Sequence, residues 1–141
     1  MRQKGFTLVE LMVVVLIVGL LAAVGVPQYA AHVAAGKMAD AQGALSNHKS
    51  QMEQYFQDRR TYLAADGTSC GVAPAQASTQ FFTVACAATA ETFSSTATAG
   101  ANSNLTGLAF TLNHLGAKST TLSGTTTCAT GWAKKKTGVC P

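Results

Sequence analysis

The sequence predicts an α+β protein in which one long N-terminal helix packs on a four-stranded antiparallel sheet. Residues up to about position 59 keep a helical pattern that is first wholly apolar and then amphipathic. After about position 62 the pattern changes to period two, with residues that favour strands. The amphipathic helix and the sheet each have one apolar face to bury, so we expect these faces to pack on each other.

The apolar segment at residues 6–26 is long enough to span a membrane. Its 21 residues would form a helix of roughly 30 Å, which is the thickness of a bilayer core. Arg2 and Lys4 precede it without an acidic neighbour. By the positive-inside rule the N-terminus stays in the cytoplasm, and the residues beyond Pro27 cross the membrane. The folded part is therefore expected outside the cytoplasm.

A short basic leader ends at Gly5, directly before the apolar segment. A secretory signal peptide is instead cut after its apolar region, so processing at Gly5 would leave the apolar segment on the mature protein. Together with the following Phe-Thr-Leu-Val-Glu, ending at Glu10, this leader closely resembles the prepilin leader of type IV pilins. The resemblance implies that a prepilin peptidase cuts after Gly5 and methylates the new amine of Phe6.

Glu10 places the only charge inside the apolar segment. A carboxylate at the centre of a membrane helix costs about 2.5–3.5 kcal/mol, and less when it lies one turn from the end. A cationic partner makes such a buried carboxylate tolerable, and cleavage at Gly5 would create one on Phe6. The resemblance to pilins assigns Glu10 the role of neutralising the Phe6 amine of a neighbouring subunit during filament assembly.

Residues 28–59 are predicted to continue the helix in amphipathic form. Apolar residues recur at spacings of three, four and seven, with charged residues off the stripe; the stripe comprises Ala34, Met38, Ala41, Leu45, Met52 and Phe56. Pro27 lacks an amide proton, so we expect a kink or local loosening near it. A single helix of some fifty residues is also the architecture that the resemblance to pilins implies.

Four strands are predicted beyond the helix. Alternating apolar and polar residues, or β-favouring residues between turn signals, place them at residues 81–87, 91–99, 108–113 and 118–122. Asn113 to Gly116 reads as the tight turn between the last two strands, because Gly116 can adopt a positive φ. Residues 64–79 and 100–107 are predicted to be loops.

The four cysteines favour disulfides over a metal site. Their closest pair is separated by eleven residues, unlike the close pairs of zinc ligands. An even count in an oxidising compartment indicates two disulfides, and the sequence leaves three pairings open. We favour Cys70–Cys86 with Cys128–Cys140, since each pair brackets one turn-rich stretch and would contribute about 3 kcal/mol in the chain-entropy model.

The resemblance extends beyond the leader. Short stretches along nearly the whole chain are similar to the minor pilins of the PilE and ComP type; these stretches are QYFQDRRTYL at 54–63, CGV at 70–72, FFTVAC at 81–86, GLAFTLN at 107–113, GAKSTT at 116–121 and GW at 131–132. The resemblance implies the pilin fold. One departure is a run of three lysines near the C-terminus, which matches no known DNA-reading motif.

Charge is unevenly distributed along the chain. Without the leader, the eight basic and six acidic side chains leave a net charge of +2, and no acidic residue follows Glu91. The possible DNA-binding residues are the lysines in this acid-free region: Lys118, Lys134, Lys135 and Lys136. Lysines that contact phosphates would make the affinity fall steeply with salt. A solvated charged loop is the competing interpretation.

The sequence indicates neither an enzyme nor a cofactor-binding protein. It has no phosphate-binding glycine loop, nucleophile elbow or carboxylate pair in the domain, and His32, His48 and His114 are scattered without metal-ligand spacing. We therefore expect no catalytic residue, no metal and no cofactor. Three parts are expected: a cleaved leader at 1–5, a membrane and assembly helix at 6–27, and a periplasmic or extracellular domain at 28–141.

The favoured function is that of a type IV pilus subunit of the minor class, assembled through its N-terminal helix. The resemblance implies a single-pass protein of the bacterial inner membrane that moves into an extracellular filament for pilus biogenesis, twitching motility, adhesion or DNA uptake. Its partners would be other pilins, the prepilin peptidase and the assembly machinery. One alternative is a competence minor pilin that binds double-stranded DNA through its basic C-terminal surface. A second is a pseudopilin of type II secretion.

Overall fold

The computed structural model of the chain describes residues 5–140. The leader residues Arg2 and Lys4, on which the predicted membrane orientation depends, lie outside the described residues. The chain forms two compact units, Met1–Val33 and Ala34–Pro141, which are described separately below. The helix α1, Leu8–Arg59, contributes to both units.

In the first unit, α1 exposes nearly every large apolar side chain, from Leu8 at 75% to Val26 at 68%. By length and composition this helix is able to cross a membrane. Its first turn is capped by Thr7, whose Oγ1 accepts a hydrogen bond from the Glu10 amide at 3.3 Å. The helical assignment continues through Pro27. An apolar helix with no buried face is suited to a surrounding that is itself apolar.

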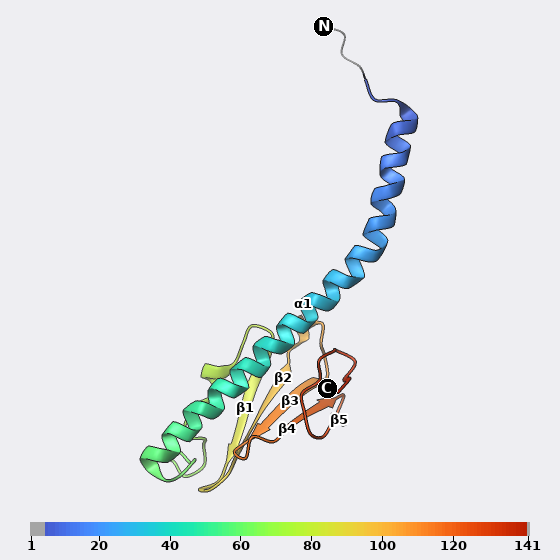
Figure 1. Ribbon diagram of the computed structural model, residues 1–141. Helices are drawn as coiled ribbons and strands as arrows, with labels where there is room; N and C mark the ends of the chain where they lie inside the picture. The colour runs from blue at the N-terminus through green and yellow to red at the C-terminus, as the bar shows by residue number, and fades with distance from the viewer. Residues whose placement is uncertain (1–4, 141) are drawn as a thin grey trace. The chain divides into compact units, whose positions relative to one another are not determined.

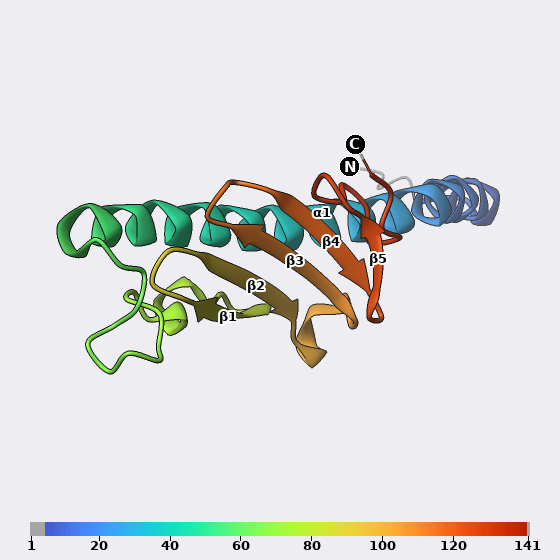
Figure 2. The same cartoon turned by 90° about the horizontal axis from the view of Figure 1, so that it is seen from below.

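In the second unit, a five-stranded antiparallel sheet packs on one face of α1 (Figure 1). The strands follow the order of the chain: β1 Phe82–Ala88, β2 Phe93–Ala99, β3 Leu108–Asn113, β4 Lys118–Leu122 and β5 Thr125–Cys128. Seen from below, β1 and β2 lie to one side of the helix, and β3 and β4 pass in front of it (Figure 2). The predicted α+β class and antiparallel sheet are confirmed.

The predicted number of strands is wrong, because β5 forms a fifth strand at the edge of the sheet. Ser123 and Gly124 both have positive φ, at 51° and 82°, as expected of a two-residue hairpin turn. Thr125 to Thr127 are all exposed, and only Cys128 is buried. A short edge strand with three exposed threonines lacks the alternation of apolar and polar residues by which the other strands are recognised.

The other predicted elements agree closely with the structure. β3 and β4 have the predicted bounds, whereas β1 and β2 begin one and two residues later than predicted. The β3–β4 turn closes through a hydrogen bond from the Gly116 amide to the Asn113 carbonyl at 2.9 Å, with φ of +78° at Gly116. Short 3₁₀ helices, Pro74–Ala77 and Ala101–Ser103, lie within the two predicted loops.

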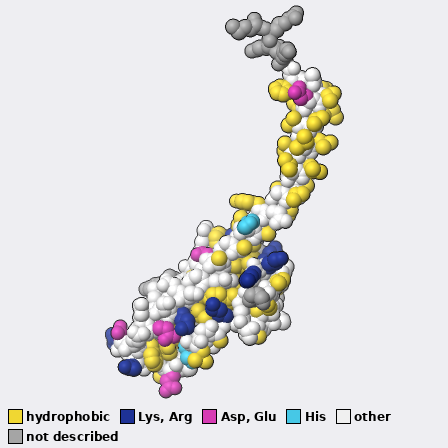
Figure 3. Space-filling model, in the orientation of Figure 1, with side chains coloured by type: hydrophobic (Ala, Val, Ile, Leu, Met, Phe, Trp, Pro, Cys, Tyr) yellow, Lys and Arg dark blue, Asp and Glu magenta, His cyan; other side chains and the backbone are white. Residues whose placement is uncertain are grey.

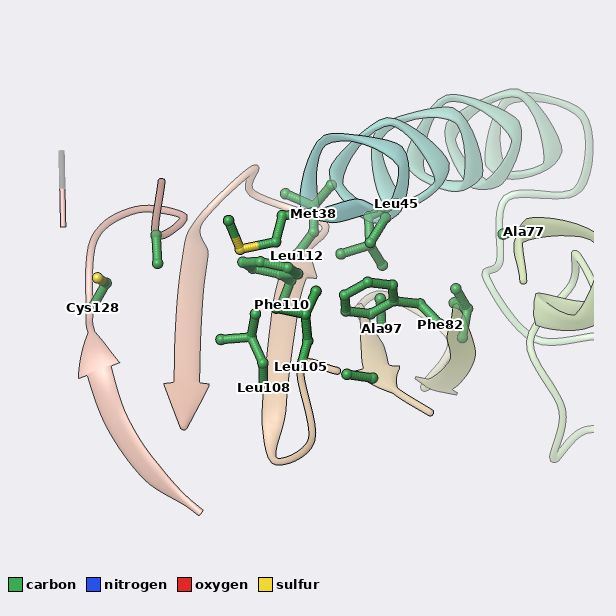
Figure 4. Close-up of a cluster of buried hydrophobic side chains, with 14 residues drawn as sticks. Met38, Leu45, Ala77, Phe82, Ala97, Leu105, Leu108, Phe110, Leu112 and Cys128 are labelled. Carbon is green, nitrogen blue, oxygen red and sulfur yellow. The ribbon is translucent and has the colours of Figure 1, made fainter. Parts of the chain in front are cut away.

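The core fills the space between α1 and the sheet (Figure 4). Met38 and Leu45 project from the helix toward Phe82 of β1 and Phe110 of β3, and all four side chains are at most 2% exposed. The Phe82 and Phe110 rings lie 5.9 Å apart, a separation at which aromatic pairs are favourable. Burial of these side chains holds the sheet on the helix and fixes the position of its turns and loops.

Candidate functional site

The predicted processing and assembly residues lie at the start of the described chain. Gly5 and Phe6 precede α1, and the Phe6 side chain is 83% exposed. Glu10 lies in the first turn of α1 and is exposed, and its carboxylate forms no ion pair with any residue of 5–140. The described residues therefore provide no cation for this carboxylate.

The structure contains the disulfides Cys70–Cys86 and Cys128–Cys140, which are the sequential pairing. The first closes residues 70–86, and a turn around Asp66 directly precedes it. Hydrogen bonds from Ser69 and Thr68 hold the pKa of the Asp66 carboxyl down at about 2, with the Ser69 hydroxyl contributing most. The carboxyl is therefore ionised at physiological pH, and this is the form that accepts these hydrogen bonds.

The second disulfide closes the C-terminal loop, which is defined here as residues 129–139. Thr120 of β4 holds this loop: its Oγ1 accepts from the Ala133 amide at 2.9 Å and donates to the Gly131 carbonyl at 3.2 Å. Gln42 of α1 donates to the Ala133 carbonyl at 3.3 Å. Hydrogen bonds from both the helix and the sheet therefore anchor the C-terminal loop.

The three consecutive lysines are displayed on the anchored C-terminal loop. Lys134, Lys135 and Lys136 are all exposed. Backbone hydrogen bonds close the loop around them, from the Lys134 amide to the Val139 carbonyl at 3.2 Å and from the Gly138 amide to the Lys135 carbonyl at 3.0 Å. The charges thus lie on a closed loop with a defined backbone.

Lys118 lies against the same loop. Its ammonium is 4.4 Å from the centroid of the Trp132 ring, within the range of a cation–π contact. Trp132 in turn donates from Nε1 to the Thr111 carbonyl of β3 at 3.1 Å. The structure therefore brings Lys118, predicted as a DNA contact together with the three consecutive lysines, next to the C-terminal loop.

Sequence reasoning did not identify Lys49 as part of this surface. Lys49 lies close to the β3–β4 turn, since a Cβ atom placed on Gly116 would be 3.9 Å from Lys49 Cε. Lys49 also pairs with Glu53 at 3.1 Å. Helical spacing could have indicated this position, because Lys49 lies seven residues, or two turns, after Gln42 and therefore on the same face of α1. We call Lys49, Lys118 and Lys134 to Lys136 the lysine flank.

On the face drawn in Figure 3, Lys and Arg side chains lie over the middle of this unit and again at its lower end, where most of the visible acidic side chains lie. Lys37 is engaged elsewhere. It donates to the Ser103 carbonyl at 3.1 Å and lies 4.2 Å from the centroid of the Phe81 ring. In the lysine flank, the exposed Lys118 of β4 lies beside the three exposed lysines of the C-terminal loop, and the partly buried Lys49 of α1 lies close to the neighbouring turn.

The histidines form no site. Among the residues that the structure describes, no group of three His, Cys, Asp or Glu side chains could hold a metal. His48 is fully buried, with Nδ1 2.9 Å from Ser95 Oγ and Nε2 3.2 Å from the Val72 carbonyl. Burial lowers its pKa, and the hydrogen bond to Val72 opposes this only in part. His48 therefore connects α1 to β2 and to the loop around Val72.

Two family models together match most of the chain. Residues 1–26 match the prokaryotic N-terminal methylation motif. Residues 27–107 match the family described as type IV minor pilin ComP, DNA uptake sequence receptor. The first match covers the leader and most of the apolar segment, and the second extends from Pro27 to the start of β3.

Curated relatives are pilus proteins and not enzymes. The fimbrial protein EcpC of Eikenella corrodens is 39% identical over 71 residues, which are 50% of this chain and 46% of that protein. The type IV major pilin protein PilE of Neisseria gonorrhoeae is 42% identical over 71 residues, which are 50% of this chain and 42% of that protein. The chain thus spans about half the length of the curated relatives that it matches.

A solved structure supports the fold. The non-core minor pilin PilV of Neisseria meningitidis superposes with a TM-score of 0.54 at 15% identity, covering 64% of this chain and 88% of that one. At this identity the match is informative about the fold alone. Since the family models match the leader and more than half of the chain, the chain belongs to the type IV pilins and, within them, to the ComP family of minor pilins.

Proposed function

We propose that the protein is a type IV pilus subunit of the minor class, which assembles into the filament through its N-terminal helix. The observation that carries this proposal is the Gly5–Phe6 junction directly before an apolar helix. We propose a cleaved leader at residues 1–5, a membrane and assembly helix at 6–27 and a folded domain at 28–141. The protein would rest in the bacterial inner membrane with a cytoplasmic N-terminus until the pilus machinery extracts it.

Processing after Gly5 gives a direct test. The filament-borne protein is expected to begin at Phe6 and to carry one added methyl group on its amine, so intact mass measurement should find the chain without residues 1–5 and heavier by that methyl. A Gly5→Ser or larger substitution should reduce cleavage, because the peptidase would have to accept a side chain there. An intact Met1, or a cut after Val26, would contradict the pilin assignment of the leader.

We propose DNA binding by the lysine flank as a second function. Three observations support it: the exposed lysines of the C-terminal loop, the contact that holds Lys118 beside that loop, and the absence of acidic residues after Glu91. The description of the ComP family as a DNA uptake sequence receptor supports the same ligand. The pilus relatives also favour a pilus subunit over a secretion pseudopilin.

Replacing Lys134, Lys135 and Lys136 together by Gln tests this function. The mature full chain in neutral-detergent micelles is expected to bind duplex DNA weakly, with a log affinity that falls by about 0.9 per phosphate contact with log salt. The triple variant should lower both the affinity and this slope. Its stability should change by less than about 0.5 kcal/mol, since these side chains are exposed.

A matched control removes basic charge elsewhere. Arg59 and Arg60 are exposed at the C-terminal end of α1, so Arg59→Gln with Arg60→Gln should alter the salt slope less than the lysine variant does. If the wild-type protein did not bind DNA at low salt, or if the triple variant had an unchanged salt slope, the DNA-binding function would be wrong. The lysines would then be solvated charges on an exposed loop.

A further inference from the structure

The lysine flank by itself would bind DNA without reading its sequence, because lysines address phosphates and not base edges. The β3–β4 turn offers a different kind of contact beside these lysines. Leu115, at this turn, is 79% exposed, whereas Val139, the other exposed large apolar side chain described in residues 34–140, is 53% exposed. A single exposed leucine is common on protein surfaces. A binding role for Leu115 therefore has to be argued from the turn that carries it and from the charges around it.

The turn that carries Leu115 is held by its own hydrogen bonds. The Asn113 carbonyl accepts from the Gly116 amide at 2.9 Å, and Asn113 Oδ1 accepts from the Ala117 amide at 2.8 Å. The Asn113 amide donates to the Ala117 carbonyl at 3.2 Å. A fixed backbone presents the leucine without the entropic cost of ordering a mobile loop on binding.

Charge is unequal on the two sides of this tip. Lys118, which is exposed, follows Leu115 by three residues, and Lys49 lies close to Gly116 but is paired with Glu53 at 3.1 Å, so Lys118 supplies the net positive charge on this side. On the other side, the His114 amide bonds to the Phe93 carbonyl at 3.0 Å, which places the β1–β2 turn with its exposed Glu91 beside the β3–β4 turn. Between the two turns lies a shallow hollow of about 420 Å³, whose exposed lining is mainly apolar and includes Ala87 and Ala88. A polyanion would therefore pass on the lysine side of Leu115.

Building on the proposed DNA function, we propose that Leu115 inserts into the minor groove of duplex DNA as an apolar wedge between two base pairs. Proteins that bind the minor groove commonly insert an apolar side chain in this way, which partly unstacks the step and bends the duplex. The lysine flank would hold the phosphates along one side while the wedge enters. Because pyrimidine–purine steps unstack most easily, binding would prefer duplexes that contain a TA or CA step at the right place.

A fluorescent base reports on the wedge directly. Duplexes with 2-aminopurine at a central TA step are titrated with the mature full chain in neutral-detergent micelles. Wild-type protein should raise the fluorescence as the base unstacks. Leu115→Ala should abolish this rise and weaken binding roughly threefold to tenfold, while leaving the salt slope unchanged because the lysines remain. The matched control Val139→Ala, which shortens an exposed apolar residue of the C-terminal loop, should keep the fluorescence rise.

The outcomes separate this proposal from the DNA function on which it rests. Salt-dependent binding by wild-type protein without any fluorescence rise would overturn the wedge and leave the lysine flank as a phosphate site. Absence of binding would overturn both. A Leu115→Ala variant with normal DNA binding and fluorescence, but poor incorporation into filaments, would overturn the wedge and assign the leucine to a contact between subunits. Glu91→Gln should strengthen binding, since it removes an acidic group beside the tip.

Discussion

Glu10→Val is expected to leave the protein in the membrane and to remove it from filaments. Valine makes the apolar segment more hydrophobic, so membrane insertion should be at least as favourable as in the wild type. In an assembled filament, however, the amine of Phe6 would be buried without its carboxylate. Removing one partner of a buried ion pair costs about 3–5 kcal/mol, which corresponds to a loss of incorporation of more than roughly a hundredfold.

Comparison of membrane and sheared-filament fractions measures this effect. Glu10→Asp is the matched control, since it keeps the charge at the same position of α1 and should retain partial incorporation. Glu10→Gln separates charge from size and should behave like the valine variant. If Glu10→Val entered filaments at the wild-type level, the Phe6 amine would need no carboxylate partner, and the role proposed for Glu10 would be wrong.

Helix α1 could be predicted from sequence because its signals are long and redundant. Of the apolar residues predicted to face the domain, Met38, Ala41, Leu45 and Met52 are buried, and Ala34 and Phe56 are partly buried. A stripe that repeats over about six turns leaves little ambiguity about which face is buried. The same holds for β3, where Leu108, Phe110 and Leu112 are buried and the residues between them are not.

β5 could not be predicted because its stability comes from its partner and not from its own pattern. Its residues pair with β4 between Thr120 and Leu122, with a register shift at Thr121. Cys128 is buried at its end and joined to Cys140. Backbone pairing and a disulfide hold this edge, and neither leaves an alternation of apolar residues in the sequence. The local signals were the Ser-Gly pair at 123–124 and the three β-favouring threonines that follow it.

The sequence predicted which lysines contribute to the candidate DNA-binding site, but not that they lie close together on one surface. The sequence indicated Lys118 and the lysine run, yet nothing in their spacing places them together. Their proximity depends on Trp132, which receives the Lys118 ammonium on its ring and anchors to β3. Lys49 belongs to a helix far away in sequence, and Leu115 is recognisable only once its exposure on a fixed turn is known. Such features arise from packing between distant segments.

Buried His48 has a defined protonation state. The Val72 carbonyl can only accept a hydrogen bond, so Nε2 must carry the proton of the neutral ring. Nδ1 then accepts from the Ser95 hydroxyl. The neutral ring is therefore fully paired between α1, β2 and the loop that leads out of Cys70. Protonation would place a charge at a site with 0% exposure, where Ser95 and Val72 are both uncharged.

Stability is accordingly expected to fall as the pH is lowered below about 6.5, the ordinary pKa of an unfolded histidine. Burial lowers the pKa of His48 in the folded chain, so the unfolded state binds the proton first. The stabilisation from the neutral ring is complete above the unfolded pKa. As the pH falls from the unfolded pKa to the folded pKa, this stabilisation is lost at about 1.4 kcal/mol per pH unit. Below the folded pKa, His48 causes no further change in stability.

Denaturant titrations between pH 7 and pH 5, where carboxylates stay ionised, measure this slope. His48→Gln can keep both hydrogen bonds without titrating, so most of the slope should disappear in that variant; an equally steep fall would assign the pH dependence to another group.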